Sequence, residues 1–135
     1  MTAVDFSEVA VERGREASDT VRFVVADVME WEPPETYDLV LIAYLHLLED
    51  ALRSVVKRVV DWLEPYGELF LIGHDRSNLV HGHGGPQMLD ILWDVPAIIG
   101  WLEGLQLVEA GVVRRPVETP DGAVYARDAL IRVRC

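Results

Sequence analysis

The chain has 135 residues, of which 50% are hydrophobic and 26% charged. This composition excludes a disordered polymer and fits one globular domain over residues 1–135. The 23 acidic residues outnumber the 12 Lys and Arg, and the formal net charge of -11 disfavours nucleic acid and anionic membranes as partners. The single cysteine, Cys135, cannot form an intrachain disulfide, and the longest apolar run, Leu39–Leu48, is short of the roughly 20 residues of a membrane span. With no basic patch before an apolar stretch at the N-terminus, we expect a cytoplasmic protein.

The first part of the chain predicts a strand, a helix and a second strand. Thr2–Val4 is apolar, and Ser7 is a suitable N-cap for a helix over Glu8–Ala17, although Gly14 costs about 1 kcal/mol there relative to alanine. Val21–Ala26 is rich in β-branched and aromatic residues, as in a buried parallel strand.

The middle of the chain continues this alternation. Tyr37–Ala43 is almost wholly apolar and predicts a buried strand, and Glu49–Leu63 has apolar residues at helical spacing. Pro65 ends that helix, and Glu68–His74 returns as a strand. The polar, glycine-rich stretch Asp75–Leu92 predicts a long loop, of a kind that often serves function.

The last third predicts a helix and an antiparallel hairpin. Asp94 caps a helix that runs to about Glu103. Leu105–Val117 and Ala123–Val133 are strand-like, and the connection Glu118–Gly122 has strong turn chemistry. The whole pattern indicates an α/β layered domain with a mostly parallel sheet and a C-terminal antiparallel hairpin.

Polar residues follow the predicted parallel strands at the edge where such sheets bind ligands. They are Asp5, Asp27, the segment Tyr44–His46, and His74 with Asp75. A carboxylate at the end of a strand can accept hydrogen bonds from a ribose diol. For any single aspartate, turn formation or helix capping is the more common explanation.

Four segments, taken in order, resemble class I S-adenosylmethionine-dependent methyltransferases, and most closely the small-molecule branch of thiopurine and tellurite-detoxifying enzymes. They are TAVDFSEVAVERGRE, VRFVVADVMEWEP, YDLVLIAYLHL and LEPYGELFLIGHD, which resemble the second to the fifth strands of that family with their flanking segments. The resemblance covers nearly the whole chain and implies a Rossmann-like fold.

The same resemblance implies S-adenosyl-L-methionine as cofactor and assigns its contacts. Asp5 stands at the acidic position that binds the ribose, with Phe6 beside it. Asp27 stands where the family contacts the adenine amino group, and Val28 stands beside the ring. Ala43 ends the strand that leads to the residues beneath the methyl group.

The implied reaction is methyl transfer to a small soluble acceptor, which needs positioning and, optionally, a general base. The candidate bases are His46, His74 and Asp75. The candidates for binding the acceptor are Tyr44, His81 and His83. For His46, a packed residue at the end of a strand is an equally good interpretation.

The chain departs from the family pattern in two places. No G-x-G-x-G or G-x-G-x-x-G motif is present, and the family's central first strand, with its glycine-rich loop and helix, would precede Met1. We therefore expect a truncated member that pairs Thr2–Val4 with Tyr37–Ala43, exchanges elements in a homodimer (a domain swap), or has lost an upstream segment. The second departure is Tyr66, where the family prefers glycine; it matters only if that turn needs a positive φ.

Two other functions stay open. A catalytically inactive methyltransferase-like chain could act as a binding or interaction module, which the missing glycine-rich loop favours. A metal-dependent enzyme could use His81 and His83, although glycine-rich loops with histidines are more often mobile lids, so we predict no metal site.

Overall fold

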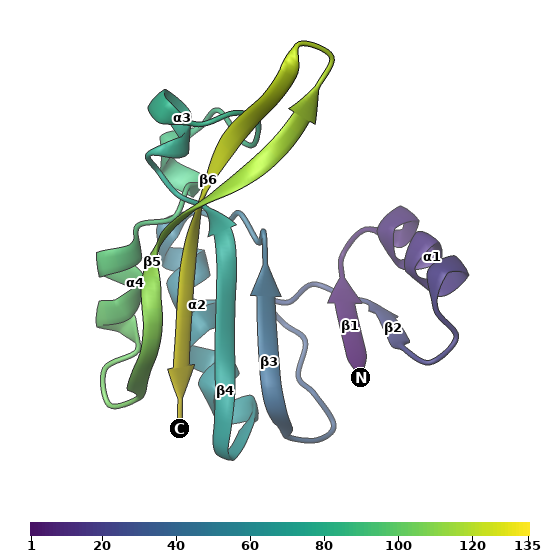
Figure 1. Cartoon of the computed structure of the whole chain (residues 1–135). Coiled ribbons are helices and arrows are strands. Elements are labelled where there is room, and N and C mark those ends of the chain that lie inside the picture. Colours follow the sequence, from purple (N-terminus) through teal and green to yellow (C-terminus); the bar gives the residue numbers. More distant parts are fainter. The chain divides into compact units, whose positions relative to one another are not determined.

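The computed structural model describes the whole chain, residues 1–135, as two compact units (Figure 1). We call Met1–Pro34 the N-terminal unit and Glu35–Cys135 the C-terminal unit. The expectation of one domain over residues 1–135 stays a prediction.

The N-terminal unit has the predicted order of strand, helix and strand. β1 (Thr2–Asp5) pairs in parallel with β2 (Arg22–Val25), and α1 (Glu8–Ala17) connects them. The hydroxyl of Ser7 accepts a hydrogen bond from the backbone N–H of Ala10 at 3.3 Å, which confirms Ser7 as the N-cap.

Gly14 has a packing role in α1 that helix propensity does not reveal. A Cβ added at this position would overlap the ring of Phe23 on β2. Val11, on the same helix, is the one buried hydrophobic residue of the N-terminal unit. The absence of a side chain at Gly14 therefore lets the helix approach the small sheet.

The C-terminal unit contains a four-stranded sheet in the order β3-β4-β6-β5. β3 and β4 are parallel, and β6 is antiparallel to both β4 and β5, which confirms the α/β fold with a C-terminal antiparallel hairpin. The hairpin projects past the other strands at the end of the sheet where β4 terminates (Figure 1). The strand bounds are β3, Tyr37–Ala43; β4, Leu63–His74; β5, Gln106–Thr119; and β6, Gly122–Arg134.

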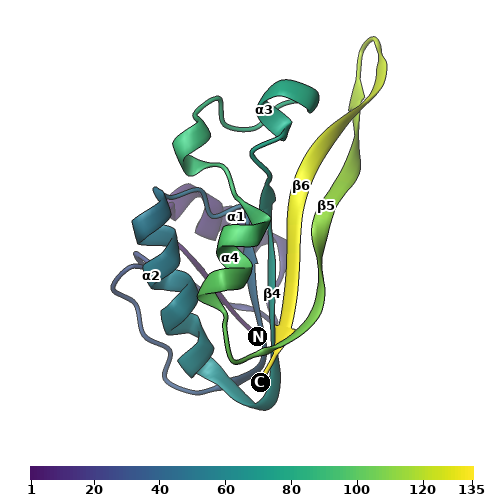
Figure 2. The ribbon, with the colours of Figure 1, turned by 90° about the vertical axis from the view of Figure 1, so that its left-hand side faces the viewer.

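Two helices lie on one face of this sheet (Figure 2). They are α2 (Glu49–Val59), which continues as the 3₁₀ turn Val60–Trp62, and α4 (Val95–Trp101). The core between helices and sheet is fully buried and apolar; it includes Val55, Val56, Leu69, Leu71, Ile98, Ile131 and Val133. This burial is the main source of stability in the unit.

The second helix ends earlier than predicted. The helical pattern extends to Leu63, but Leu63 already pairs with Tyr37 as the first residue of β4. Tyr66, just after Pro65, has φ 69°, so the turn does use the left-handed conformation that favours glycine.

The predicted loop Asp75–Leu92 contains two short helical turns, α3 (Asn78–His81) and the 3₁₀ turn Leu89–Ile91. Asn78 is buried and fastens this segment: its Nδ2 donates to the carbonyl of Gly84, and its Oδ1 accepts from the N–H of Arg127. Asp94 precedes α4 as predicted, but its carboxylate pairs with Arg76 at 2.7 Å instead of capping the helix. The order in this loop comes from side-chain contacts that periodicity cannot reveal.

Within the N-terminal unit the strand partner of β1 is β2, and within the C-terminal unit the strand partner of β3 is β4. Each of these two strands therefore has one edge without a strand partner in its own unit. The pairing of Thr2–Val4 with Tyr37–Ala43 stays a prediction. No helix is long and apolar enough to cross a membrane.

Candidate functional site

Three of the predicted site residues meet in the C-terminal unit. Tyr44 and His46 follow the end of β3, and His74 ends β4; because the two strands are parallel, their carboxyl ends lie at the same edge. The Tyr44 ring lies 5.2 Å from the His74 ring and 6.4 Å from the His46 ring, measured between centroids.

The side chain of Asp128, on β6, contacts this group. Its side chain is 0% exposed, and its Oδ2 accepts hydrogen bonds from the Tyr44 hydroxyl at 2.8 Å and from Arg115 Nε at 2.7 Å. Its Oδ1 lies 3.3 Å from Nδ1 of His74, although neither atom makes an aligned hydrogen bond. The carboxylate therefore holds a tyrosine, an arginine and a histidine around one buried negative charge.

The backbone of Tyr44 is held in an unusual conformation. Its φ is 52°, which is costly for a residue with a Cβ. The N–H of Tyr44 donates to the carbonyl of Ile72 at 2.7 Å, and the hydroxyl is held by Asp128. Burial, followed by the hydrogen bond to Asp128, raises the pKa of Tyr44, so the hydroxyl stays protonated.

His46 has a defined tautomer. Its Nδ1 lies 3.1 Å from the carbonyl oxygen of Ile91, which can only accept, so Nδ1 carries the proton and Nε2 the lone pair. Nε2 is buried and has no hydrogen-bond partner. Burial lowers the pKa of His46 below its ordinary value, which keeps the imidazole neutral at pH 7.

His74 stacks on His46, with ring centroids 5.3 Å apart and ring planes at 16°. Burial lowers the pKa of His74 too, against the opposing charge of Asp128. The ring lies directly under Gly85: a Cβ at that position would come within 2.7 Å of His74 Cδ2 and Nε2. The glycine-rich loop thus covers His74 and, through Ile91, also contacts His46.

Asp75 forms its hydrogen bonds with residues outside this group. It is buried, and its Oδ1 accepts a hydrogen bond from the N–H of Ser77 at 2.8 Å, as in an Asx turn. Its backbone N–H donates to the carbonyl of Arg127. These contacts give Asp75 a structural role at the start of the loop.

The predicted adenosine contacts lie in the N-terminal unit, except Ala43, which ends β3. Asp5 ends β1 and Asp27 follows β2, and the N–H of Ala26 donates to the carbonyl of Asp5 at 3.0 Å. Phe6 is 78% exposed, and Val28 is partly buried.

Both aspartates use one carboxylate oxygen in a turn. Asp5 Oδ1 accepts from the N–H of Ser7, and Asp27 Oδ1 accepts from the N–H of Met29, each at 2.8 Å. The two Oδ2 atoms make no hydrogen bond within the chain. The turn role and a ligand role are therefore compatible, and the residues fit the hydroxyl and amino groups of an adenosine.

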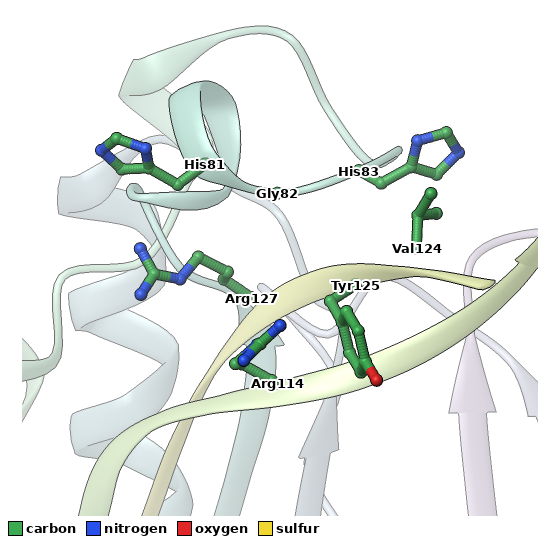
Figure 3. Close-up of a pocket in the computed structure, with 7 residues that line it drawn as sticks. All are labelled: His81, Gly82, His83, Arg114, Val124, Tyr125 and Arg127. Atoms are coloured by element: carbon green, nitrogen blue, oxygen red, sulfur yellow. The ribbon is translucent and has the colours of Figure 1, made fainter.

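His81 and His83 are placed elsewhere. They line an open cavity of about 560 Å³ with Gly82, Arg114, Val124, Tyr125 and Arg127. Figure 3 shows the two imidazoles at opposite ends of the short segment that crosses the hairpin. No group of three or more His, Cys, Asp or Glu side chains is arranged to hold a metal ion.

Sequence reasoning missed Asp128 and Arg115. A signal for Asp128 was present, because it is the one acidic residue in the predicted strand Ala123–Val133 and has the apolar residues Ala126 and Leu130 beside it on the same face. Such a charge in a strand is a candidate buried group. Arg115 gave no comparable signal, since arginines are ordinary on hairpins.

Comparison with known proteins supports the assignment suggested by the sequence. A family model described as "Methyltransferase domain" matches residues 1–67. A search of curated proteins finds no match.

Solved structures match over nearly the whole chain. N-methyltransferase NodS from Bradyrhizobium japonicum has 19% identity and a TM-score of 0.71, over 98% of this chain and 71% of that chain. TehB from Haemophilus influenzae has 13% identity and a TM-score of 0.75, over 98% of this chain and 49% of that chain. The 1,6-didemethyltoxoflavin-N1-methyltransferase from Burkholderia thailandensis has 20% identity and a TM-score of 0.64, over 98% of this chain and 60% of that chain.

At these identities the structural likeness establishes the fold, and the chain spans about half to seven tenths of these relatives' length. The family model adds the sequence evidence over residues 1–67. Residues 1–67 therefore match a methyltransferase-domain model, and the fold of the chain is that of solved S-adenosylmethionine-dependent methyltransferases.

Proposed function

We propose that the protein transfers a methyl group from S-adenosyl-L-methionine to a small soluble acceptor. The observation that carries this proposal is the cluster of Tyr44, His46, His74 and Asp128 at the carboxyl ends of β3 and β4. This edge is where α/β sheets bind their ligands, and the cluster contains two neutral bases.

The cofactor of the family is S-adenosyl-L-methionine, which supplies an electrophilic methyl group when bound. In the N-terminal unit, Asp5 Oδ2 would accept from the ribose hydroxyls, and Asp27 Oδ2 would accept from the adenine amino group. Phe6 and Val28 would contact the apolar faces of the adenosine. Both aspartates keep their turn contacts in this arrangement, so binding requires no local rearrangement.

In the C-terminal unit, His46 Nε2 would accept the proton that the acceptor loses. Its lone pair is fixed by the hydrogen bond from Nδ1–H to Ile91, and its lowered pKa leaves it unprotonated at neutral pH. Tyr44, held by Asp128 and Arg115, would orient the acceptor. Because Nε2 is buried, the atoms that cover it must move before an acceptor reaches it.

Cofactor binding is the first test. We would titrate the protein with S-adenosylhomocysteine by calorimetry and compare Asp5→Asn and Asp27→Asn. Asparagine keeps Oδ1 for the turn and replaces the free Oδ2 with an NH₂ group, so each variant removes the ligand acceptor without removing the turn. Asp19→Asn, an exposed acidic residue of the same unit, is the matched control.

We expect saturable binding that each of the first two variants weakens by about tenfold or more, as for the loss of a charge-assisted hydrogen bond, and that Asp19→Asn leaves unchanged. No binding by folded wild-type protein would refute the proposal. Equal binding by all variants would refute the assignment of Asp5 and Asp27.

A second candidate function is an inactive interaction module that forms a homodimer by pairing or exchanging strands. The free edges of β1 and β3 favour it, as do Leu39 and Leu41 of β3, which are 58% and 55% exposed. Two apolar side chains at a free edge favour association with another copy.

Light scattering over a range of concentrations tests this candidate. We expect a dimer, and we expect Leu41→Lys to yield monomer because a charge on an edge strand opposes pairing. Val112→Lys is the control, since Val112 is also an exposed apolar strand residue but lies on β5. A monodisperse monomer of wild-type protein at all concentrations would exclude the dimer.

A further inference from the structure

The cavity beside the hairpin has an unusual set of side chains. Arg114 and Tyr125 come from β5 and β6, and Arg127 lies two residues further along β6 (Figure 3). His81 and His83 complete the cationic or basic lining, and no lining residue is acidic. This composition contrasts with the formal net charge of -11 of the whole chain.

The two arginines of the cavity have no carboxylate partner. Five other arginines of the C-terminal unit pair with Asp or Glu: Arg53, Arg76, Arg115, Arg132 and Arg134. The guanidinium of Arg114 instead lies over the Tyr125 ring, 4.2 Å from its centroid. That contact orients the guanidinium without neutralising its charge.

Arg114 and Arg127 are also direct partners in the ladder between β5 and β6. Like charges placed directly opposite each other on neighbouring strands destabilise the pair. The strand position of Arg127 is fixed, because its N–H donates to Asn78 and its carbonyl accepts from Asp75. The ladder thus places two cationic residues directly opposite each other, a cost that a bound anion would offset.

From this arrangement we propose that the cavity is a binding site for a small organic anion, a carboxylate or phosphate carried on a planar apolar group. Arg114 and Arg127 would hold the anionic group with charge-assisted hydrogen bonds. Tyr125 and Val124 would contact the apolar part of the ligand. The site does not depend on the proposed methyl transfer.

The test is a titration of the full chain, without cofactor, with phenyl phosphate and with benzoate, followed by NMR. Benzyl alcohol, a neutral ligand of similar size, is the matched ligand control. The variants are Arg114→Gln and Arg127→Gln, and Lys57→Gln on α2 is the matched control because Lys57 lies outside the cavity.

We expect saturable shifts with at least one of the two anions and none with benzyl alcohol. Arg114→Gln and Arg127→Gln should each weaken binding about tenfold or more, and Lys57→Gln should not. The melting temperatures of the arginine variants should stay near that of the wild type, because each relieves the repulsion between strand partners; the loss of binding is then not a loss of folding.

Binding of phenyl phosphate or of benzoate supports the proposed site. The anion that binds, a phosphate or a carboxylate, identifies the anionic group of the ligand. The proposal is overturned if neither anion binds, if benzyl alcohol binds equally well, or if both arginine variants bind as the wild type does.

Discussion

The two units of the chain differ greatly in the number of hydrophobic residues that they bury. In the N-terminal unit, one helix and two strands bury a single hydrophobic residue, Val11. In the C-terminal unit, two helices and four strands bury a continuous apolar layer. A 34-residue segment with a two-stranded sheet is below the size at which a core usually suffices for stability.

The two units also carry different sets of candidate site residues. Asp5 and Asp27, the proposed cofactor-binding residues, lie on exposed turns of the N-terminal unit. Tyr44, His46 and His74 lie at the ends of β3 and β4 in the C-terminal unit, and Asp128 contacts Tyr44 and His74 from the middle of β6. We infer that ligand binding has more to add to the stability of the N-terminal unit, since a ligand that binds only the folded state stabilises it.

Hydrogen exchange should give the largest contrast between the units. We expect amides of β1 and β2 to exchange at least about a hundredfold faster than those of β4 and β6, because local opening costs less where little is buried. NMR-detected exchange of the full chain measures both at once. Equal protection of the amides in the two sheets would mean that the N-terminal unit is stabilised by contacts other than those of its own core.

Within the C-terminal unit, Asp128→Asn should be the most damaging conservative change. It leaves Arg115 without its counter-charge and replaces an acceptor with a donor in a fully buried position, a loss of about 2–4 kcal/mol. Urea unfolding measures it, with Asp121→Asn at the exposed hairpin tip as control. A loss no larger than that of the control would show that Asp128 does not organise the cluster.

Lowering the pH should destabilise the C-terminal unit through the same cluster. His46 and His74 have folded-state pKa values below the ordinary 6.5, so the unfolded state binds more protons and stability falls as the pH drops below about 6.5. We expect the effect to be smaller than that of Asp128→Asn, because the charge of Asp128 partly opposes both shifts. Melting temperatures between pH 5 and 8 check it, and a double variant, His46→Gln with His74→Gln, should flatten the dependence.

The fold was largely predictable from the sequence because its signals are local. Continuous apolar stretches such as Tyr37–Ala43, and turn residues such as Asp121 and Gly122, indicate the strands and the hairpin without information on distant contacts. The early end of α2 was not predictable, since it depends on the pairing of Leu63 with Tyr37.

The candidate site was predictable only in part, for a related reason. Tyr44, His46 and His74 follow strands whose parallel direction brings their ends together. Asp128 and Arg115 reach the same place from an antiparallel hairpin, and their pairing with Tyr44 spans more than 70 residues. Side-chain contacts of that range leave no periodic signal in the sequence.

Gly14→Ala tests whether the N-terminal unit is packed as the structure has it. Helix propensity alone predicts a gain of about 1 kcal/mol, but the overlap with Phe23 predicts a net loss of about 1–2 kcal/mol. Exchange rates of α1 and β2 amides measure the change within the unit, and Arg13→Ala, in the same helix, is the control. A gain in protection would show that the Phe23 ring moves aside and that the unit is loosely packed.

Tyr66→Gly should give the smallest effect, a gain of about 1 kcal/mol in the stability of the C-terminal unit. Tyr66 has φ 69° and is 83% exposed, so glycine relieves backbone strain and loses little buried surface. Tyr66→Ala is the matched control, because it removes the ring and keeps the Cβ that causes the strain. If urea unfolding shows the same gain for both variants, the ring and not the backbone is responsible. If glycine alone stabilises the C-terminal unit, the turn carries backbone strain. The better-packed C-terminal unit tolerates that strain, and the N-terminal unit, with its single buried side chain, could not.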